Sequence, residues 1–238
     1  MKNRSFLKTA GFYGVVLGAA FLVPSSVFAS AISGKVYFEG QPQVVEMIKA
    51  DADPNCKMVH PNGITPDQVI VNANGTLKNV FVYVKEGLAG KTFEPPKEPV
   101  VFDQNGCQYS PKVFGIQVNR PLEILNSDDT VHNVHALPKN SKEFNLGMPM
   151  KGMKLKKSFN KPEVMVKIKC EVHPWMTAYA GVLDHPFFSV SGEDGSFQIK
   201  DLPPGSYVLE AWHEKYGTMT QNVTVTDQDQ STDFKFKG

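Results

Sequence analysis

The chain has 238 residues, of which 41% are hydrophobic and 21% charged, and its formal net charge is +1. This composition excludes a disordered tail and a coiled coil, and the length allows one or two globular domains. A nucleic-acid binder would need a clear positive excess, so none is expected. The apolar run from Ala10 to Val23 is shorter than the ~20 residues that cross a bilayer, which argues against a membrane span in the mature chain.

The first 31 residues have the order of a secretory signal peptide. Lys2, Arg4 and Lys8 precede the apolar run, and small residues follow it around Ala29. We therefore predict a signal peptide at residues 1–31 and a periplasmic protein, or one that is secreted or on the cell surface. Its removal takes three basic residues and no acidic ones, which changes the formal net charge from +1 to −2.

Beyond residue 31, short alternating runs separated by Gly, Pro, Asn and Asp predict an all-β protein. Residues 39–71 are expected to form a long loop with a helical turn near 44–49. The expected strands are 34–38, 79–85, 99–103, 113–118, 122–126, 164–170, 178–183, 196–200, 207–212, 221–226 and 232–237.

Residues 193–217 contain two alternating strands around a Leu-Pro-Pro-Gly turn. This stretch resembles carboxypeptidase regulatory-like (Cna-B-like) β-sandwich modules, which usually open with strands like 32–36 and 80–84. The resemblance implies that residues 32–98 and 187–238 form one sandwich, interrupted by a second domain at 99–186. A tandem order of the two domains is the alternative, because sequential elements usually pack as neighbours.

The chain has three cysteines, and an odd number leaves one thiol unpaired in an exported protein. Cys170 ends a predicted strand in which Val164, Val166 and Ile168 share its face, so its sulfur is expected to point inward. His173 and Met176 follow at once. A thiolate, an imidazole and a thioether thus lie within seven residues.

A second imidazole is available upstream, from His132 or His135. One thiolate, two imidazoles and a weak axial methionine form the ligand set of a blue-copper electron-transfer site. Soft sulfur suits Cu(I), whereas imidazole accepts both oxidation states, so such a set favours an electron carrier.

The motif His132-Asn133-Val134-His135, followed by Cys-Glu-Val-His-Pro-Trp-Met, resembles the cupredoxins. Within that family the amicyanin-like proteins are closest, because they share the short Cys-x-x-His-x-x-Met loop. The whole arrangement is similar to exported, methylamine-utilisation-like proteins that join a cupredoxin to a regulatory-like domain. The resemblance implies a Greek-key β-sandwich at 99–186 that binds one copper, as Cu(I) or Cu(II), and it favours His132 over His135. The implied ligands are His132, Cys170 and His173, with Met176 as the axial one.

Four residues are expected around these ligands: Asn133, His135, Glu171 and Trp175. In cupredoxins the Asn after the first His ties its loop to a Ser or Thr after the Cys, a position held here by Glu171, which leaves this tie open. A carboxylate near the thiolate would favour the oxidised metal and lower the reduction potential. His173 is expected at the surface, where its ring edge and an apolar rim with Trp175 would pass electrons.

Cys56 and Cys107 lie in polar loops and are predicted to form a disulfide between the outer sandwich and the inserted domain. Such a bond would stabilise the fold by about 4 kcal/mol in the chain-entropy model. Two free thiols, or a second thiolate site with His60, are the alternatives.

Residues 139–169 carry nine lysines against Glu143 and Glu163. A segment of this charge could steer an acidic partner by complementary charge, or could simply be a solvated face. The lysines predicted to contact a partner are Lys151, Lys154, Lys156 and Lys157.

These features predict an exported type 1 (blue) copper protein that carries single electrons between redox proteins, such as a c-type cytochrome and a dehydrogenase or oxidase. Because no substrate pocket or acid–base pair is evident, the sequence predicts that it is not an enzyme. Two alternatives are a copper-delivery protein that uses the thioethers of Met148, Met150 and Met153, and a structural β-sandwich without a redox role.

Overall fold

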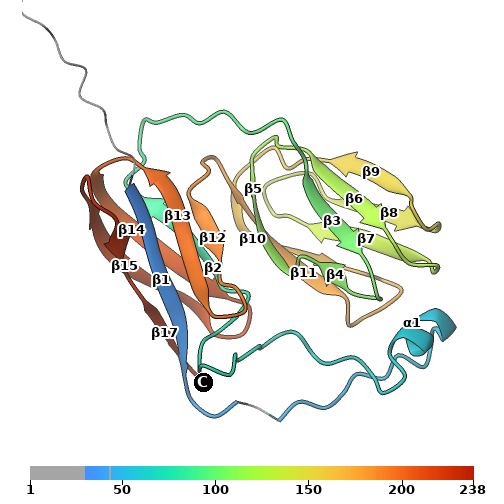
Figure 1. Cartoon of the computed structure of the whole chain (residues 1–238). Coiled ribbons are helices and arrows are strands. Elements are labelled where there is room, and N and C mark those ends of the chain that lie inside the picture. The colour runs from blue at the N-terminus through green and yellow to red at the C-terminus, as the bar shows by residue number, and fades with distance from the viewer. Residues whose placement is uncertain (1–29, 43) are drawn as a thin grey trace, which may run out of the picture.

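The computed structural model describes residues 30–42 and 44–238, and the predicted signal peptide lies outside them except for Ser30 and Ala31. These residues form seventeen strands and one short helix, so the all-β prediction is confirmed. The strands make four sheets, which pack in pairs as two sandwiches that lie side by side (Figure 1).

The outer sandwich takes its strands from both ends of the chain. Large apolar side chains from its two sheets, among them Val36, Phe234 and Leu209, fill its core. One sheet has the order β13 (Ser196–Leu202), β1 (Ser30–Glu39), β16 (Gln230–Ser231), and β17 (Phe234–Lys237) also pairs with β1; the other has the order β12 (Phe188–Val190), β2 (Phe81–Glu86), β14 (Gly205–His213), β15 (Gly217–Val225).

The inner sandwich is built from the middle of the chain, between β2 and β12. Its core includes Phe102, Ile124, Val134 and Ile168, which come from both of its sheets. One sheet has the order β5 (Val113–Gln117), β11 (Thr177–Leu183), β10 (Glu163–Lys169), β7 (His132–Leu137), β8 (Phe144–Met148); the other has the order β4 (Tyr109–Ser110), β3 (Val100–Gln104), β6 (Leu122–Asn126), β9 (Lys154–Lys157).

Two glycines allow the sandwiches to approach each other closely. A Cβ atom on Gly181 of β11 would lie 2.3 Å from the ring of Phe81, and one on Gly115 of β5 would lie 2.2 Å from the ring of Phe188. Such distances are well inside van der Waals contact, so only glycine fits at these two positions. The fully buried ring of Phe81 and the partly buried ring of Phe188 thus rest directly on the backbone of the inner sandwich.

Several local predictions are wrong. The helix is α1 (Pro54–Val59) rather than a turn at 44–49, and Ile48 instead pairs with Ile64. Val164 is 37% exposed, because the register of β10 against β11 shifts between Glu163 and Val166 and interrupts the alternation there. The sequence analysis also missed the strands β4, β7, β8, β9, β12 and β16.

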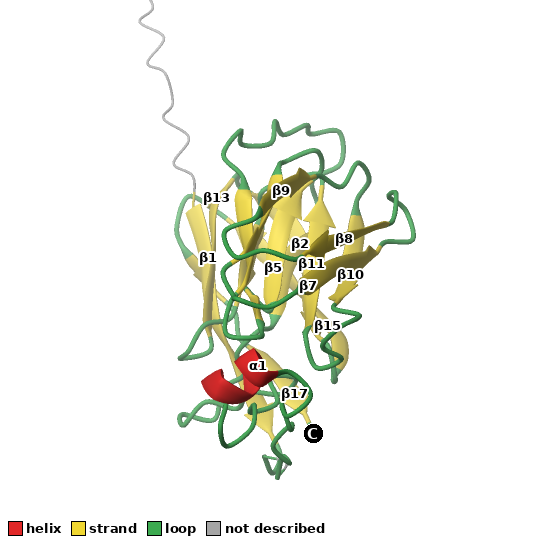
Figure 2. Ribbon diagram, turned by 90° about the vertical axis from the view of Figure 1, so that its right-hand side faces the viewer, coloured by secondary structure: helices red, strands yellow, loops and turns green. Residues whose placement is uncertain are grey.

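Residues 48–64, here called the α1 loop, leave the outer sandwich and reach the end of the inner one. The loop is closed at its base by reciprocal backbone hydrogen bonds between Ile48 and Ile64, at 2.9 and 2.8 Å. Helix α1, red in Figure 2, lies in the lower part of the molecule, at about the height of β17. The Asp53 carboxylate caps it by accepting hydrogen bonds from the backbone of Asn55 and Cys56.

Candidate metal centre

Three of the predicted ligands lie together at the end of the inner sandwich. His132 opens β7, whereas Cys170 and His173 lie in the turn that follows β10. The Nδ1 atoms of the two imidazoles are 2.9 Å apart, and the sulfur of Cys170 is 3.8 Å from Nδ1 of His173. All three side chains are buried, and their potential ligand atoms lie within 4.8 Å of one another.

Backbone hydrogen bonds shape the turn that carries Cys170 and His173. The N–H of Met176 donates to the carbonyl of His173 at 2.9 Å, and the N–H of Cys170 donates to the carbonyl of Met176 at 3.0 Å. The turn therefore folds back on itself over seven residues. Met176, the predicted axial ligand, is buried within it and packs in the core of the inner sandwich.

Strand alternation separates the two candidate histidines of β7. His132 and His135 are three residues apart and so point to opposite faces of the sheet. His132 is fully buried, whereas His135 lies on the outer face between two carboxylates, 2.6 Å from Glu171 and 2.6 Å from Glu143. Those carboxylates raise the pKa of His135. Only His132 faces the cluster.

Asn133 ties the two loops of the site together. Its side-chain oxygen accepts a hydrogen bond from the backbone N–H of Glu171 at 2.7 Å. Because the donor is the backbone, the tie does not need a Ser or Thr at this position, and the substitution by Glu171 does not break it. The carboxylate of Glu171 turns to His135 and Lys169, at 2.6 and 2.8 Å, so two basic groups offset its charge.

The site favours an ionised thiol before any metal binds. Burial raises the pKa of Cys170, but hydrogen bonds from His132, His173 and the backbone outweigh it and lower that pKa to about 5. Burial also works against a charged His132, but Asp128 and Cys170 raise its pKa to about 9. Both shifts favour the charged forms of the pair, a thiolate beside an imidazolium, in the metal-free site.

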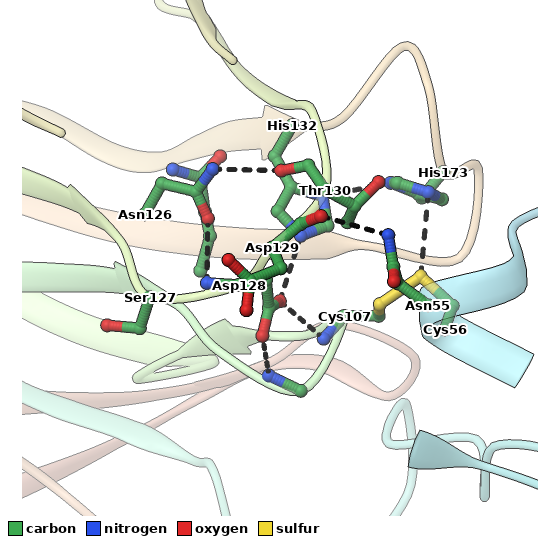
Figure 3. A network of polar contacts seen from close by, with 12 residues as sticks. Asn55, Cys56, Cys107, Asn126, Ser127, Asp128, Asp129, Thr130, His132 and His173 are labelled. Carbon is green, nitrogen blue, oxygen red and sulfur yellow. Dashed lines mark hydrogen bonds and ion pairs between the residues drawn. A yellow bond between two sulfur atoms is a disulfide. The ribbon is translucent and has the colours of Figure 1, made fainter. Parts of the chain in front are cut away.

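Two carboxylates that the sequence analysis missed contact the outer nitrogens of the imidazoles. Asp128 Oδ2 lies 2.9 Å from Nε2 of His132, and Asp53 Oδ2 lies 3.1 Å from Nε2 of His173. Figure 3 shows Asp128 beside His132 and the sulfur of Cys56 beside His173. Two sequence features could have indicated these carboxylates. Asp53 starts an N-cap motif before Pro54, and Asp128 lies in an Asp-rich loop just before His132.

The predicted disulfide is present between Cys56 of α1 and Cys107, and it covers the site. The sulfur of Cys56 is 3.6 Å from Nε2 of His173. The indole N–H of Trp175 donates to the carbonyl of Cys107 at 2.9 Å, and its ring packs between the α1 loop and the core. His173 is only 2% exposed, so the prediction of a solvent-exposed ring edge with an apolar rim is wrong. The α1 loop covers the ring, and the sequence analysis did not assign this loop a position in the fold.

The lysines of residues 139–169 are partly neutralised by acidic neighbours. Lys151 pairs with Asp129 at 2.8 Å, and Lys154 and Lys156 both approach Glu123, at 3.3 and 4.0 Å. Lys157 lies over the ring of Phe144. The excess positive charge that the sequence shows is therefore not a bare patch, and the predicted docking role of these lysines stays a prediction.

The donor set fits copper. A thiolate and two imidazoles with their Nδ1 atoms turned toward the same space are ligands that copper accepts in both oxidation states. The described residues hold two further groups of potential ligands, formed by Asp53, Cys56 and His173 and by Cys107, Asp128 and His132. Each of these includes a disulfide sulfur, which is not available as a thiolate, so the cluster with Cys170 is the best candidate.

Comparison with known proteins finds similarity only among solved structures. No family model matches the chain, and no curated protein matches it. A Cu-containing nitrite reductase from Thermus scotoductus SA-01 aligns with 41% of this chain at 23% identity and a TM-score of 0.35, and the alignment spans 25% of the reductase. A purple cupredoxin from Nitrosopumilus maritimus aligns over 35% of this chain and 98% of its own, with 22% identity and a TM-score of 0.30.

Amicyanin is also among the similar structures. A reduced amicyanin variant aligns with 42% of this chain and 97% of its own at 20% identity, with a TM-score of 0.32. These similarities concern the fold of part of the chain only. The interpretation of the outer sandwich as a regulatory-like module stays a prediction.

The prediction that the protein is not an enzyme is wrong, because a copper nitrite reductase is among the structures that the chain resembles. Within the described residues, no helix has the length and apolar character needed to cross a membrane.

Proposed function

We propose that the protein holds one copper ion at His132, Cys170 and His173, with Met176 as axial ligand, and carries single electrons between redox proteins. The observation that supports this most directly is the buried cluster itself, with two Nδ1 atoms 2.9 Å apart and the Cys170 sulfur 3.8 Å from one of them. Bound copper would supply the Cu(I)/Cu(II) couple.

The protein's own contribution is to keep these side chains in place. The core of the inner sandwich excludes water from Cys170 and Met176, and the Asn133 tie fixes the turn after β10 against β7. A site whose ligands are held in this way needs little rearrangement when the charge on the metal changes by one unit. This is the property that a carrier of single electrons requires.

Delivery of copper through surface methionines has less support. Met148 is fully buried and Met153 packs against the core, so of the three methionines only Met150, at 64% exposure, lies open to solvent.

We further propose that the protein is exported and that its outer sandwich is a regulatory-like module. Its proposed partners are redox proteins, such as a c-type cytochrome and a dehydrogenase or oxidase.

Titration of the apo protein with Cu(II), followed by visible and EPR spectroscopy, tests the proposal. We expect one copper per chain, with an intense thiolate-to-copper band that is absent from Cys170→Ala. His135→Ala is the matched control, because His135 lies on the opposite face of β7 and should leave the band in place. A wild-type protein without the band, or a Cys170→Ala variant that keeps it, would contradict the assignment.

A further inference from the structure

The two imidazoles of the metal centre have the same arrangement of neighbours. In each ring Nδ1 points toward the other ligands, and Nε2 contacts a carboxylate: Asp128 for His132, at 2.9 Å, and Asp53 for His173, at 3.1 Å. The two carboxylates come from different parts of the chain, one from the loop before β7 and the other from the α1 loop. Both are held by other groups, so neither contact depends on a freely moving side chain.

We propose that Asp128 and Asp53 are positioning residues of the metal centre, each holding one ligand imidazole by its outer nitrogen, and that the disulfide-bound α1 loop exists in part to bring Asp53 to His173. This inference rests on the proposed copper site. A carboxylate that accepts the Nε2–H bond fixes the tautomer with a free Nδ1 lone pair and fixes the orientation of the ring. It also makes the imidazole a stronger donor to a cation.

Asp128 is fixed by three donors. Its Oδ1 accepts the backbone N–H of Gly106 at 2.7 Å, and its Oδ2 accepts the N–H of Cys107 at 2.8 Å besides the contact with His132. These backbone donors come from a turn in which both residues have a positive φ, of 62° and 54°. The turn that carries one half of the disulfide thus aims its N–H groups at the carboxylate that holds His132.

Asp53 is fixed just as firmly, at the N-terminal end of α1. Its Oδ1 caps the helix through the N–H groups of Asn55 and Cys56, at 2.8 and 3.1 Å, and its Oδ2 accepts the hydroxyl of Thr130 at 2.6 Å. The same Oδ2 reaches His173. One carboxylate therefore joins the helix, the loop before β7 and the ligand.

Three further links hold the α1 loop over the centre. The disulfide joins Cys56 to Cys107, the side chain of Asn55 donates to the carbonyl of Asp129 at 2.9 Å, and a ring nitrogen of His60 contacts the carbonyl of Gly106 at 2.7 Å. Every link ends on the two inner-sandwich loops that surround the metal centre. The cover over His173 is therefore a built feature of the fold, and Asp53 is its point of contact with the ligand.

The two carboxylates add negative charge next to the ligands, and negative charge stabilises Cu(II) more than Cu(I). Their removal should thus weaken Cu(II) binding, raise the reduction potential and leave the fold intact. Loss of such an outer partner typically lowers metal affinity 10- to 100-fold. Since Asn also caps helices well, Asp53→Asn keeps the end of α1 while it removes the charge.

The test compares Asp53→Asn, Asp53→Ala and Asp128→Asn with Asp51→Asn, a matched control two residues from Asp53 that pairs with Lys57 on the surface. Competition with a chelator gives the Cu(II) and Zn(II) affinities, and voltammetry gives the potential. We expect a 10- to 100-fold loss of Cu(II) affinity and a higher potential for the Asp53 and Asp128 variants, with the control equal to wild type. Thermal melts of the apo proteins identify any variant that does not fold.

Zn(II) affinity distinguishes a failure of the positioning role from a failure of the proposed copper function, because Zn(II) binds the same ligands without redox chemistry. A folded Asp53→Asn variant with a normal blue band, normal affinities and an unchanged potential would overturn the positioning role and leave the copper site standing. A wild-type protein without a blue band would instead overturn the proposed function. In that case an unchanged Zn(II) affinity in Asp53→Asn and Asp128→Asn would overturn the positioning role as well, and a 10- to 100-fold loss would support it.

Discussion

The sulfur of Cys56 lies 3.6 Å from Nε2 of His173, although 117 residues separate them in the sequence. The contact brings a disulfide from the α1 loop against a ligand of the candidate metal centre, on the side of the ring that faces away from Cys170. In this structure the centre is closed by a covalently bound cover. Access of solvent, chelators and partners to His173 therefore depends on the α1 loop.

Removal of this disulfide should open the centre. In the double variant Cys56→Ala/Cys107→Ala we expect a chelator to extract Cu(I) faster than from wild type, because the cover is then held only by hydrogen bonds and apolar packing. Loss of a native disulfide also typically costs about 2–5 kcal/mol of stability. Stopped-flow extraction and thermal melts measure the two effects. Equal extraction rates in the variant and in wild type would show that the loop does not control access.

Strand pattern and motif spacing predicted much of the fold and of the ligand set. The alternation of β10 buries Val166 and Ile168, Cys170 is buried directly after the strand, and the spacing of Cys170, His173 and Met176 puts all three in one turn. Alternation could also have separated His132 from His135, because residues three apart in a strand face opposite sides.

The cover over the centre could not be predicted in the same way. Residues 48–64 show no strand or helix period, and the position of the loop follows from contacts with Cys107, Asp129 and Gly106, which are remote in the sequence. This loop covers His173 through Asp53 and Cys56. The turn after β10, considered by itself, therefore predicted a solvent-exposed ring edge for His173, whereas the ring is buried in the structure.

Gly181 should be intolerant of any side chain. In Gly181→Ala the new methyl group would lie 2.3 Å from the ring of Phe81, which is fully buried between the sandwiches, so the ring or the backbone would have to shift. Overpacking of this kind typically costs about 1–3 kcal/mol. Gly147→Ala is the control, because a Cβ there meets no atom within 4 Å. Urea unfolding should show a loss for the first variant only, and similar stabilities for the two would contradict the close packing.

Acid should destabilise the outer sandwich through His213. Burial, with Lys215 and Lys112 nearby, lowers the pKa of His213 from 6.5 to about 4. Between about pH 6.5 and pH 4 the imidazole is therefore protonated in the unfolded chain but neutral in the folded one. The contribution of the neutral His213 to the free energy of unfolding is fully present above pH 6.5. It is lost as the pH falls from 6.5 to 4, by about 3 kcal/mol at most.

Urea unfolding at pH 7 and pH 4.5 measures this effect as a difference between wild type and His213→Asn, which does not titrate. The variant is expected to be less stable at pH 7, since the buried ring packs on Tyr216 and its Nδ1 accepts two backbone hydrogen bonds. It should nevertheless lose less stability than wild type between the two pH values. An equal loss in both proteins would place the acid sensitivity elsewhere.

The tie between Asn133 and residue 171 should depend on the first side chain and not on the second. Asn133→Ala removes the oxygen that accepts the Glu171 N–H at 2.7 Å and leaves that part-buried donor without its protein partner, which costs about 1 kcal/mol. Glu171→Thr keeps the backbone donor, and the two pairs that it removes, with Lys169 and His135, involve an exposed carboxylate, where ion pairs contribute little to stability. Thermal melts of the two apo variants should therefore show the larger loss for Asn133→Ala, and the reverse order would mean that the side chain of Glu171 forms the tie.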